Sequence, residues 1–171
     1  EREREMSGAP IPTLSTAGRH NVFVYGSLLA DEVVGVLLKR VPPTSPALLH
    51  GFHRFSIKGR VYPAILPVEN KKVDGKVLLG ITDLELDILD NFEDVEYERS
   101  TVEISLMDNP EKLQAYTYVW MDKDDPDLKG EWDFSEWKEL HMKDFLEMTI
   151  RFMEDYEGAE SDAGRLRLQQ S

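Results

Sequence analysis

Alternating apolar and polar positions predict several β-strands along the chain. Period-2 patterns and short runs of β-branched residues predict strands over residues 21–25, 47–58, 76–81, 97–107 and 113–121. The last two flank Asp108-Asn109-Pro110, so they are expected to form a hairpin. Gly51 is expected at a bulge, and the charged stretch 70–75 at a turn.

Residues 61–66 are also expected to be extended. Because Pro63 cannot donate to a ladder, this segment is predicted to be an edge or irregular strand.

Helical spacing occurs in three places. Asp31 is expected to cap a short helix, and Thr82 with Glu85 forms a capping-box pattern before a helix that ends near residues 91–94. Asp133 and Glu136 form a second such pattern. The apolar residues beyond it recur at steps of three and four, which predicts one long amphipathic helix carrying Trp137, Leu140, His141, Phe145, Met148, Phe152 and Tyr156.

These elements suggest one domain within the 171 residues. Residues 1–20 are polar and rich in proline and glycine, so we expect a disordered segment, followed by a domain over 21–157 and a frayed tail over 158–171.

The net charge of the chain limits the classes of partner that it is expected to bind. The net charge of −13 argues against nucleic acid and against an anionic membrane surface, both of which require a positive field. The chain has no cysteine, which excludes a thiolate nucleophile. With no apolar run of about 18 residues and no apolar core of a signal peptide, a cytoplasmic location is the default expectation.

Metal sites are not indicated. Asp122–Asp127 lacks the glycine and glutamate of an EF-hand loop and is expected to be a polar surface loop. The histidines lack metal-site spacing and are expected to be structural or exposed.

The end of the first strand is the first candidate for chemistry. It runs directly into Gly26-Ser27, and glycine permits close approach of the backbone to a ligand or a positive φ. A strand, a glycine turn and a helix start can point backbone N–H groups at an anion or oxyanion. The glycine pattern of a P-loop or of a dinucleotide fingerprint is absent, so a nucleotide site is not predicted.

Two motifs in this order carry a family resemblance. Phe-Val-Tyr-Gly-Ser-Leu at 23–28 and Leu-Asp-Asn-Phe-Glu-Asp-Val-Glu-Tyr-Glu-Arg at 89–99 resemble signatures of the γ-glutamylcyclotransferase-like proteins. Gly-Glu-Trp-Asp-Phe at 130–134 and Trp-Lys-Glu-Leu-His at 137–141 resemble the plant AIG2-like branch. The family also has a Tyr-Pro-Ala/Gly segment beside its pocket, similar to residues 62–64.

The resemblance implies an α/β (α+β) fold: a mixed, mostly antiparallel barrel-like sheet with peripheral helices and a long C-terminal helix. It implies cyclisation of a γ-glutamyl amide or γ-glutamyl amine to 5-oxoproline with release of a free amine. The family's general acid/base falls on Glu93, and the ligand-binding loop on Phe23, Val24, Tyr25, Gly26, Ser27 and Leu28. No metal or organic cofactor is implied. We expect a monomer whose partner is a small γ-glutamyl substrate.

Glu93 is also plausible from its position alone. A carboxylate at a helix C-terminus beside Phe92 meets the negative end of the dipole and an apolar wall, and both raise its pKa. Tyr97 and Arg99 are interpreted as a packing residue and an ion-pair partner, and Glu96 and Glu98 as lying outside the pocket.

One position departs from the family pattern. Asp94 stands where a glycine usually follows the glutamate, and a second carboxylate there could disturb the base. An alternative hypothesis is therefore a non-catalytic small-ligand-binding or stress- or defence-associated interaction protein that retains the pocket.

Overall fold

The computed structural model describes residues 19–107 and 111–170, with the backbone alone for residues 160–170. Its strands are β1 (Arg19–Val24), β2 (Thr44–Ile57), β3 (Ala64–Thr82), β4 (Tyr97–Leu106), β5 (Lys112–Trp120) and β6 (Leu128–Lys129). Its helices are the 3₁₀ helix η1 (Ser27–Leu29), α2 (Asp31–Leu38), α3 (Asp83–Glu93), α4 (Phe134–Leu140) and α5 (Met142–Gln170). Residues 1–18 of the expected disordered segment and the turn at 108–110 lie outside the described residues. Residues 19 and 20, the end of that expected segment, instead begin β1.

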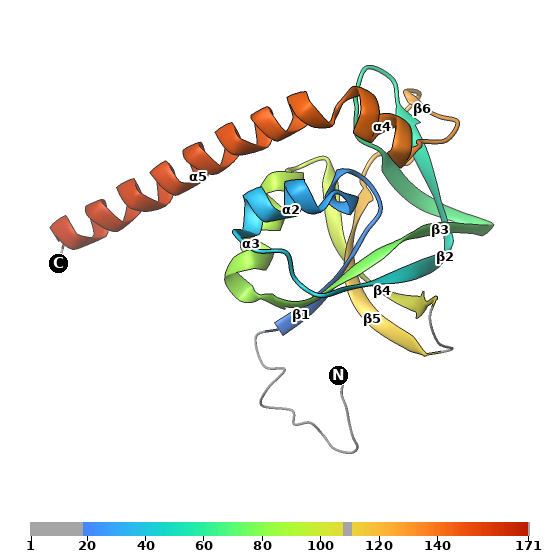
Figure 1. The fold of residues 1–171 in the computed structure, drawn as a ribbon, viewed down its shortest axis with the longest axis horizontal. Coiled ribbons are helices and arrows are strands. Elements are labelled where there is room, and N and C mark those ends of the chain that lie inside the picture. Colours follow the sequence, from blue (N-terminus) through green and yellow to red (C-terminus); the bar gives the residue numbers. More distant parts are fainter. Residues whose placement is uncertain (1–18, 108–110, 171) are drawn as a thin grey trace, which may run out of the picture.

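Five of the strands close into a barrel (Figure 1). The sheet order is β3-β1-β5-β4-β2-β6, and an additional pairing of β2 with β3 joins the two ends of the five-stranded part. The β1–β5 pair is parallel and the other pairs are antiparallel, including the expected β4–β5 hairpin. The predicted mixed, mostly antiparallel barrel-like α+β fold with peripheral helices is confirmed.

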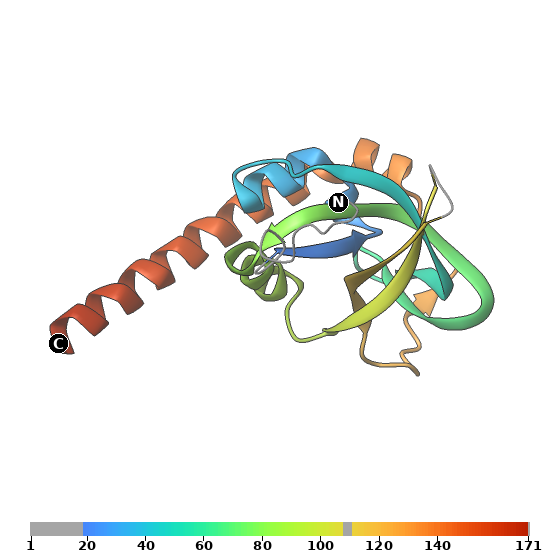
Figure 2. The same cartoon turned by 90° about the horizontal axis from the view of Figure 1, so that it is seen from below.

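β1 separates two cores because successive side chains of a strand point to opposite faces. Phe23 and Tyr25 pack inside the barrel with residues of β2, β3, β4 and β5. Val22 and Val24 pack outside it, against the core that the helices cover. Figure 2 shows the helices gathered on one side of the barrel, with α5 extending away from it. The chain leaves β1 between these two cores, and that exit places the glycine turn.

The turn expected at residues 70–75 is wrong. β3 continues through this stretch and pairs with β2, as in the pairs Val73–Leu49 and Gly75–Ala47. The stretch was predicted to be a turn because it is rich in charged residues. In the structure these residues lie on the exposed face of β3, whereas Val73 is buried in the barrel. The ladder is nevertheless irregular here: the register shift between His50 and Phe52 of β2 falls opposite residues 68–71 of β3, where Asn70 has a φ of +68°. Gly51 has a φ of +83°, so the predicted bulge is confirmed.

α2 begins differently from the prediction. Its N-cap is Ala30, which makes no side-chain capping bond, and Asp31 is the first helical residue. The Asp31 carboxylate instead pairs with Lys76 at 2.8 Å.

The capping box that begins α3 is confirmed. Thr82 accepts from the Glu85 amide, and Glu85 accepts from the Thr82 amide. Because α3 starts at a fixed residue, its last residue, Glu93, is also fixed in place.

The C-terminal helix is interrupted where one continuous helix was expected. α4 ends before His141 and α5 begins after it, with the chain changing direction between them (Figure 1). Asp133 caps α4 by accepting from the Glu136 amide at 2.8 Å. Leu140 is 64% exposed and is not part of the buried stripe, whereas Trp137 and Phe145 are buried. The helical backbone of α5 continues through most of the expected tail, as far as Gln170.

No helix within the described part of the chain has the length and hydrophobicity required to cross a membrane.

Candidate active site

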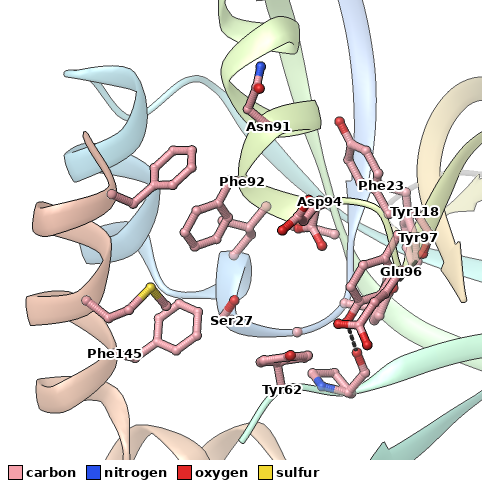
Figure 3. Close-up of a pocket in the computed structure, with 18 residues that line it drawn as sticks. Phe23, Ser27, Tyr62, Asn91, Phe92, Asp94, Glu96, Tyr97, Tyr118 and Phe145 are labelled. Carbon is pink, nitrogen blue, oxygen red and sulfur yellow. Dashed lines mark hydrogen bonds between the residues drawn. The ribbon is translucent and has the colours of Figure 1, made fainter. Parts of the chain in front are cut away.

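A cavity of about 300 Å³ opens where the end of β1 meets the end of α3 (Figure 3). All seven residues singled out from the sequence line it: Glu93 from α3, and Phe23, Val24, Tyr25, Gly26, Ser27 and Leu28 from the end of β1, the turn after it and η1. The structure thus brings together two motifs that are about 65 residues apart in the chain, while their roles remain predictions.

Gly26 is required by a close contact. Its φ is −130°, so a positive φ does not explain the glycine. A Cβ atom at this position would lie 2.8 Å from the Cδ and Cγ atoms of Pro63, inside van der Waals contact. The Pro63 ring therefore presses on the turn that ends β1, and it also lines the cavity.

η1 follows this turn directly. The Gly26 carbonyl accepts from Leu29 at 2.9 Å and the Ser27 carbonyl accepts from Ala30 at 3.1 Å. The amides at the start of a helical turn have no partner within that turn, so the Ser27 and Leu28 N–H groups precede its first bond. Both residues are buried at the cavity wall, where a ligand could use these donors.

Glu93 is the last residue of α3 and is half-buried. Burial, followed by the negative charge of Asp90, raises the pKa of the Glu93 carboxyl from 4.5 to about 8. Its position at the end of the helix and its apolar setting were expected, but the contribution of Asp90 was not. Asp90 precedes Glu93 by three residues and so lies on the same face of α3, a spacing that is readable in the sequence.

Asp90 is held by two donors. Tyr118 donates to it at 2.6 Å, and Arg99 pairs with its other oxygen at 2.6 Å. The predicted role of Arg99 as an ion-pair partner is confirmed. Both oxygens of Asp90 are therefore engaged, beside the Glu93 carboxyl whose pKa is raised.

Three tyrosines around the cavity, Tyr25, Tyr97 and Tyr118, donate their hydroxyl protons to other groups of the protein. Tyr25 donates to the Tyr118 carbonyl at 2.5 Å, and Tyr97 donates to the Pro63 carbonyl at 2.8 Å. Burial raises the pKa of Tyr25, Tyr97 and Tyr118, and the charge of Glu93 raises each further. The predicted packing role of Tyr97 is confirmed, because its ring meets Trp120 edge-on at 5.0 Å.

Glu96 lines the cavity, contrary to the expectation that it lies outside. Its carboxylate forms a two-bond pair with Arg60, at 2.5 and 2.7 Å. Arg60 also donates to the Tyr62 hydroxyl. Tyr62 and Pro63 line the cavity, as the resemblance of residues 62–64 implies. Glu98 is exposed and outside the lining, as expected.

Asp94 has a backbone conformation that favours glycine. Its φ is +66° and its ψ −167°, a region that side chains avoid. Its carboxylate accepts a hydrogen bond from the next amide, that of Val95, at 2.8 Å. A glycine would adopt this conformation without strain, whereas Asp94 adopts it at the cost of strain.

Residues from α5 form an apolar wall beside the cavity, which the predicted amphipathic helix did not indicate. We define the α5 wall as Phe145, Met148 and Phe152, all of which line the cavity. The Phe92 ring from α3 packs edge-on against Phe145 at 5.9 Å and Phe152 at 5.2 Å. In Figure 3 Phe145 lies on one side of Ser27, with Glu96 and Tyr97 on the other. Helical spacing reveals the stripe but not the cavity beside it.

Among the described residues, no cluster of three or more histidine or carboxylate side chains could hold a metal ion. The loop at Asp122–Asp127 is bonded internally, for example from the Asp124 amide to the Asp122 carboxylate.

The fold and site define a class of protein with a barrel, a glycine turn at the end of the first strand, and a carboxyl that faces it. Comparison with known proteins agrees with this class. Residues 22–138 match the family model described as gamma-glutamyl cyclotransferase, AIG2-like. The chain therefore belongs to this family.

Relatives from Arabidopsis thaliana resemble the chain along most of its length. "AIG2-like protein D" is 64% identical over 141 residues, covering 82% of this chain and 93% of that protein. "AIG2-like protein C" is 60% identical over 142 residues, covering 83% of each. These matches confirm the predicted plant AIG2-like branch.

Solved structures share the fold. An Arabidopsis thaliana protein solved in solution has 51% identity and a TM-score of 0.64, covering 81% of this chain and 93% of its own. A protein named gamma-glutamyl cyclotransferase has 18% identity and a TM-score of 0.53, covering 60% and 67%. The latter supports the fold alone.

Proposed function

We propose that this protein is a γ-glutamylcyclotransferase that converts a γ-glutamyl amide or γ-glutamyl amine to 5-oxoproline and a free amine. The observation that carries the proposal is the placement of Glu93, with a pKa of about 8, in one cavity with the backbone of residues 23–28. A carboxyl that titrates near neutrality can both accept and donate a proton under physiological conditions.

The reaction is an intramolecular aminolysis. The α-amine nitrogen of the γ-glutamyl group attacks its side-chain carbonyl carbon, a C–N bond forms, and the amide C–N bond to the leaving amine breaks. The attacking nitrogen goes from ammonium to lactam N–H and loses two protons, whereas the departing nitrogen gains two. Ionised Glu93 accepts the first proton from the α-ammonium and delivers it to the leaving nitrogen, and the same carboxyl can relay the second.

The backbone of residues 25–28 supplies the electrostatic stabilisation that this reaction needs. Amide N–H groups at the start of η1 donate to the oxygen that becomes negative as the tetrahedral intermediate forms, or to the substrate carboxylate. Because nucleophile and electrophile belong to one molecule, the cavity has to fold the substrate and transfer protons, and needs no activated side-chain nucleophile.

Two experiments test this proposal. In the first, purified protein is incubated with γ-glutamyl dipeptides, γ-glutamyl-lysine and simple γ-glutamyl alkylamides, and 5-oxoproline is measured. Formation of 5-oxoproline from at least one of them, lost in Glu93→Gln, is the expected result. In the second, titration with 5-oxoproline is followed by amide NMR, and the shifts should centre on Gly26–Leu28.

The strained backbone of Asp94 favours one alternative, a non-catalytic small-ligand-binding or interaction protein. This candidate takes over if 5-oxoproline binds at residues 26–28 while no γ-glutamyl compound is turned over. Asp94→Gly then tests whether the departure from the family pattern is the cause, because it restores the usual residue.

A further inference from the structure

The α5 wall lies beyond the part of the chain that matches the family model. That match ends at residue 138, whereas Phe145, Met148 and Phe152 follow it. The cavity therefore has one side made of family motifs and a second side, apolar, that α5 adds. Met148 is 43% exposed although it is apolar, so its side chain is available to a ligand in the cavity.

The charges around the cavity have one sign. Its lining includes Glu93, Asp94 and Glu96, and no lysine or arginine among the described residues. The nearby arginines are already engaged: Arg60 pairs with Glu96, and Arg99 with Asp90. Arg54 pairs with Asp74 and donates to the Tyr25 carbonyl. A γ-glutamyl substrate brings one carboxylate on its glutamyl part, for which the backbone amides of residues 25–28 are the available donors. A second carboxylate, on the leaving group, would meet acidic side chains without a cation to pair with.

We propose that the α5 wall is the leaving-group subsite, and that it selects γ-glutamyl amides of apolar amines that carry no carboxylate, with an aromatic or branched aliphatic body. This inference rests on the proposed cyclotransferase function. The ring or alkyl chain of the amine packs on Met148, Phe145 and Phe152, while the amide bond lies toward Glu93. The cavity volume of about 300 Å³ is at the lower end of the range for small-molecule sites, which suits a compact amine.

Three substrates separate the two features of this subsite. γ-Glutamyl-phenethylamide has the ring and no second carboxylate, γ-glutamyl-phenylalanine adds the carboxylate, and γ-glutamyl-ethylamide lacks the ring. We expect kcat/KM for the phenethylamide to exceed that of each of the others by at least about tenfold. Equal values for all three, or a higher value for γ-glutamyl-phenylalanine or γ-glutamyl-lysine, would overturn the inference.

Variants of α5 provide the matched comparison. Met148→Ala should lower the ratio of phenethylamide to ethylamide kcat/KM by several-fold. Met148→Lys places a cation at the wall and should raise the ratio of γ-glutamyl-phenylalanine to phenethylamide turnover by about tenfold. Ile150 is similarly exposed, at 46%, on the same helix but outside the cavity lining, so Ile150→Ala and Ile150→Lys should leave both ratios unchanged. If substitutions at Met148 and Ile150 change the ratios equally, the effect comes from a general change in α5, and the proposed subsite is contradicted.

Binding distinguishes a failure of the subsite from a failure of the proposed function. If wild type turns over none of these three compounds and no other member of the γ-glutamyl panel above, the cyclotransferase proposal fails, and calorimetry with the three compounds then decides on the subsite. Binding of the phenethylamide at least about tenfold tighter than the ethylamide, lost in Met148→Ala and kept in Ile150→Ala, would support it. Equal affinities would overturn it.

Discussion

The carboxylates of Asp90 and Glu93 lie one helical turn apart at the end of α3, but their surroundings are opposite. Asp90 accepts from Tyr118 and Arg99, whereas no hydrogen bond or ion pair from the described residues reaches the Glu93 carboxylate. The unpaired carboxyl is the one whose pKa rises to about 8, through burial and through the negative charge of Asp90. A carboxyl with a pKa raised toward neutrality is typical of an acid–base site.

Removing the Asp90 charge should shift the titration of Glu93. In Asp90→Asn, Glu93 loses a negative neighbour, so its pKa should fall and the acidic limb of the kcat/KM profile should move to lower pH by roughly half to one unit. Asp87→Asn makes the same charge change one turn earlier on α3, outside the cavity lining, and should leave the limb in place. A limb that stays fixed in Asp90→Asn would show that Asp90 does not tune Glu93.

Replacing Glu93 tests the acid–base role directly. Glu93→Gln keeps the size of the side chain but cannot accept a proton, so turnover should fall by about 10²–10⁴-fold, the usual contribution of general acid–base catalysis. The fold should remain intact by circular dichroism. Glu98→Gln is the matched control, because Glu98 is an exposed glutamate outside the cavity lining. Activity of Glu93→Gln within a few-fold of wild type would assign proton transfer to another group.

Stability should depend on pH through Glu93. Its pKa is raised from 4.5 to about 8 on folding, so between these values the folded protein holds a proton that the unfolded chain has released. The free energy of unfolding therefore loses a contribution as pH rises through this window. Glu93→Gln has no such loss, and its advantage over wild type in denaturant titrations should grow from pH 5 to pH 8 by at least about 1 kcal/mol. A constant difference would contradict the raised pKa.

Gly26 should not tolerate a side chain. Its Cβ would lie 2.8 Å from Pro63, so Gly26→Val should lower stability by about 1–3 kcal/mol and abolish 5-oxoproline binding. Gly35 in α2 is the control: a Cβ there lies 3.8 Å from the nearest side chain, that of Val41, and alanine favours helices, so Gly35→Ala should be neutral or stabilising. If Gly26→Val binds 5-oxoproline as tightly as wild type, the turn at Gly26 is not part of the ligand site.

Asp94→Gly should stabilise the protein. A side chain at φ +66° and ψ −167° costs about 1–3 kcal/mol, which exceeds the roughly 0.5–1 kcal/mol of extra chain entropy that glycine loses on folding. A net gain of about 1 kcal/mol in thermal or chemical unfolding is therefore expected. Asp94→Ala also removes the bond to the Val95 amide but keeps a Cβ atom, so it should give no gain. Equal stability of the two variants would contradict the strain.

Local chemistry in the sequence was sufficient for several features. Alternation of side chains predicts the strands and the β4–β5 hairpin, and Thr82 with Glu85 predicts the start of α3, because these signals depend on neighbours within a few residues. The glycine after the first strand is also a local signal, whereas Glu93 was assigned through the family resemblance, with which its place at the end of a helix agrees. Prediction from neighbouring residues was wrong in two places. The charged part of β3 shows no clear strand alternation, and the break between α4 and α5 at His141 has no signal in the helical spacing.

Tertiary structure decided which of these pieces meet. The pairing of β2 with β3 closes the barrel, and closure brings the Gly26 turn, Pro63 and Glu93 to one cavity. Contacts between residues distant in the chain explain why position 26 must be glycine, because Pro63 lies against it. They also determine that Arg99 pairs with the Asp90 carboxylate and that Phe145, Met148 and Phe152 of α5 border the cavity. The sequence by itself determined the type of most elements, because periodicity and capping are local, and the candidate groups, because two motifs resemble signatures of the family. The pKa of Glu93 depends on burial and on the neighbouring charge, and folding alone supplies the burial.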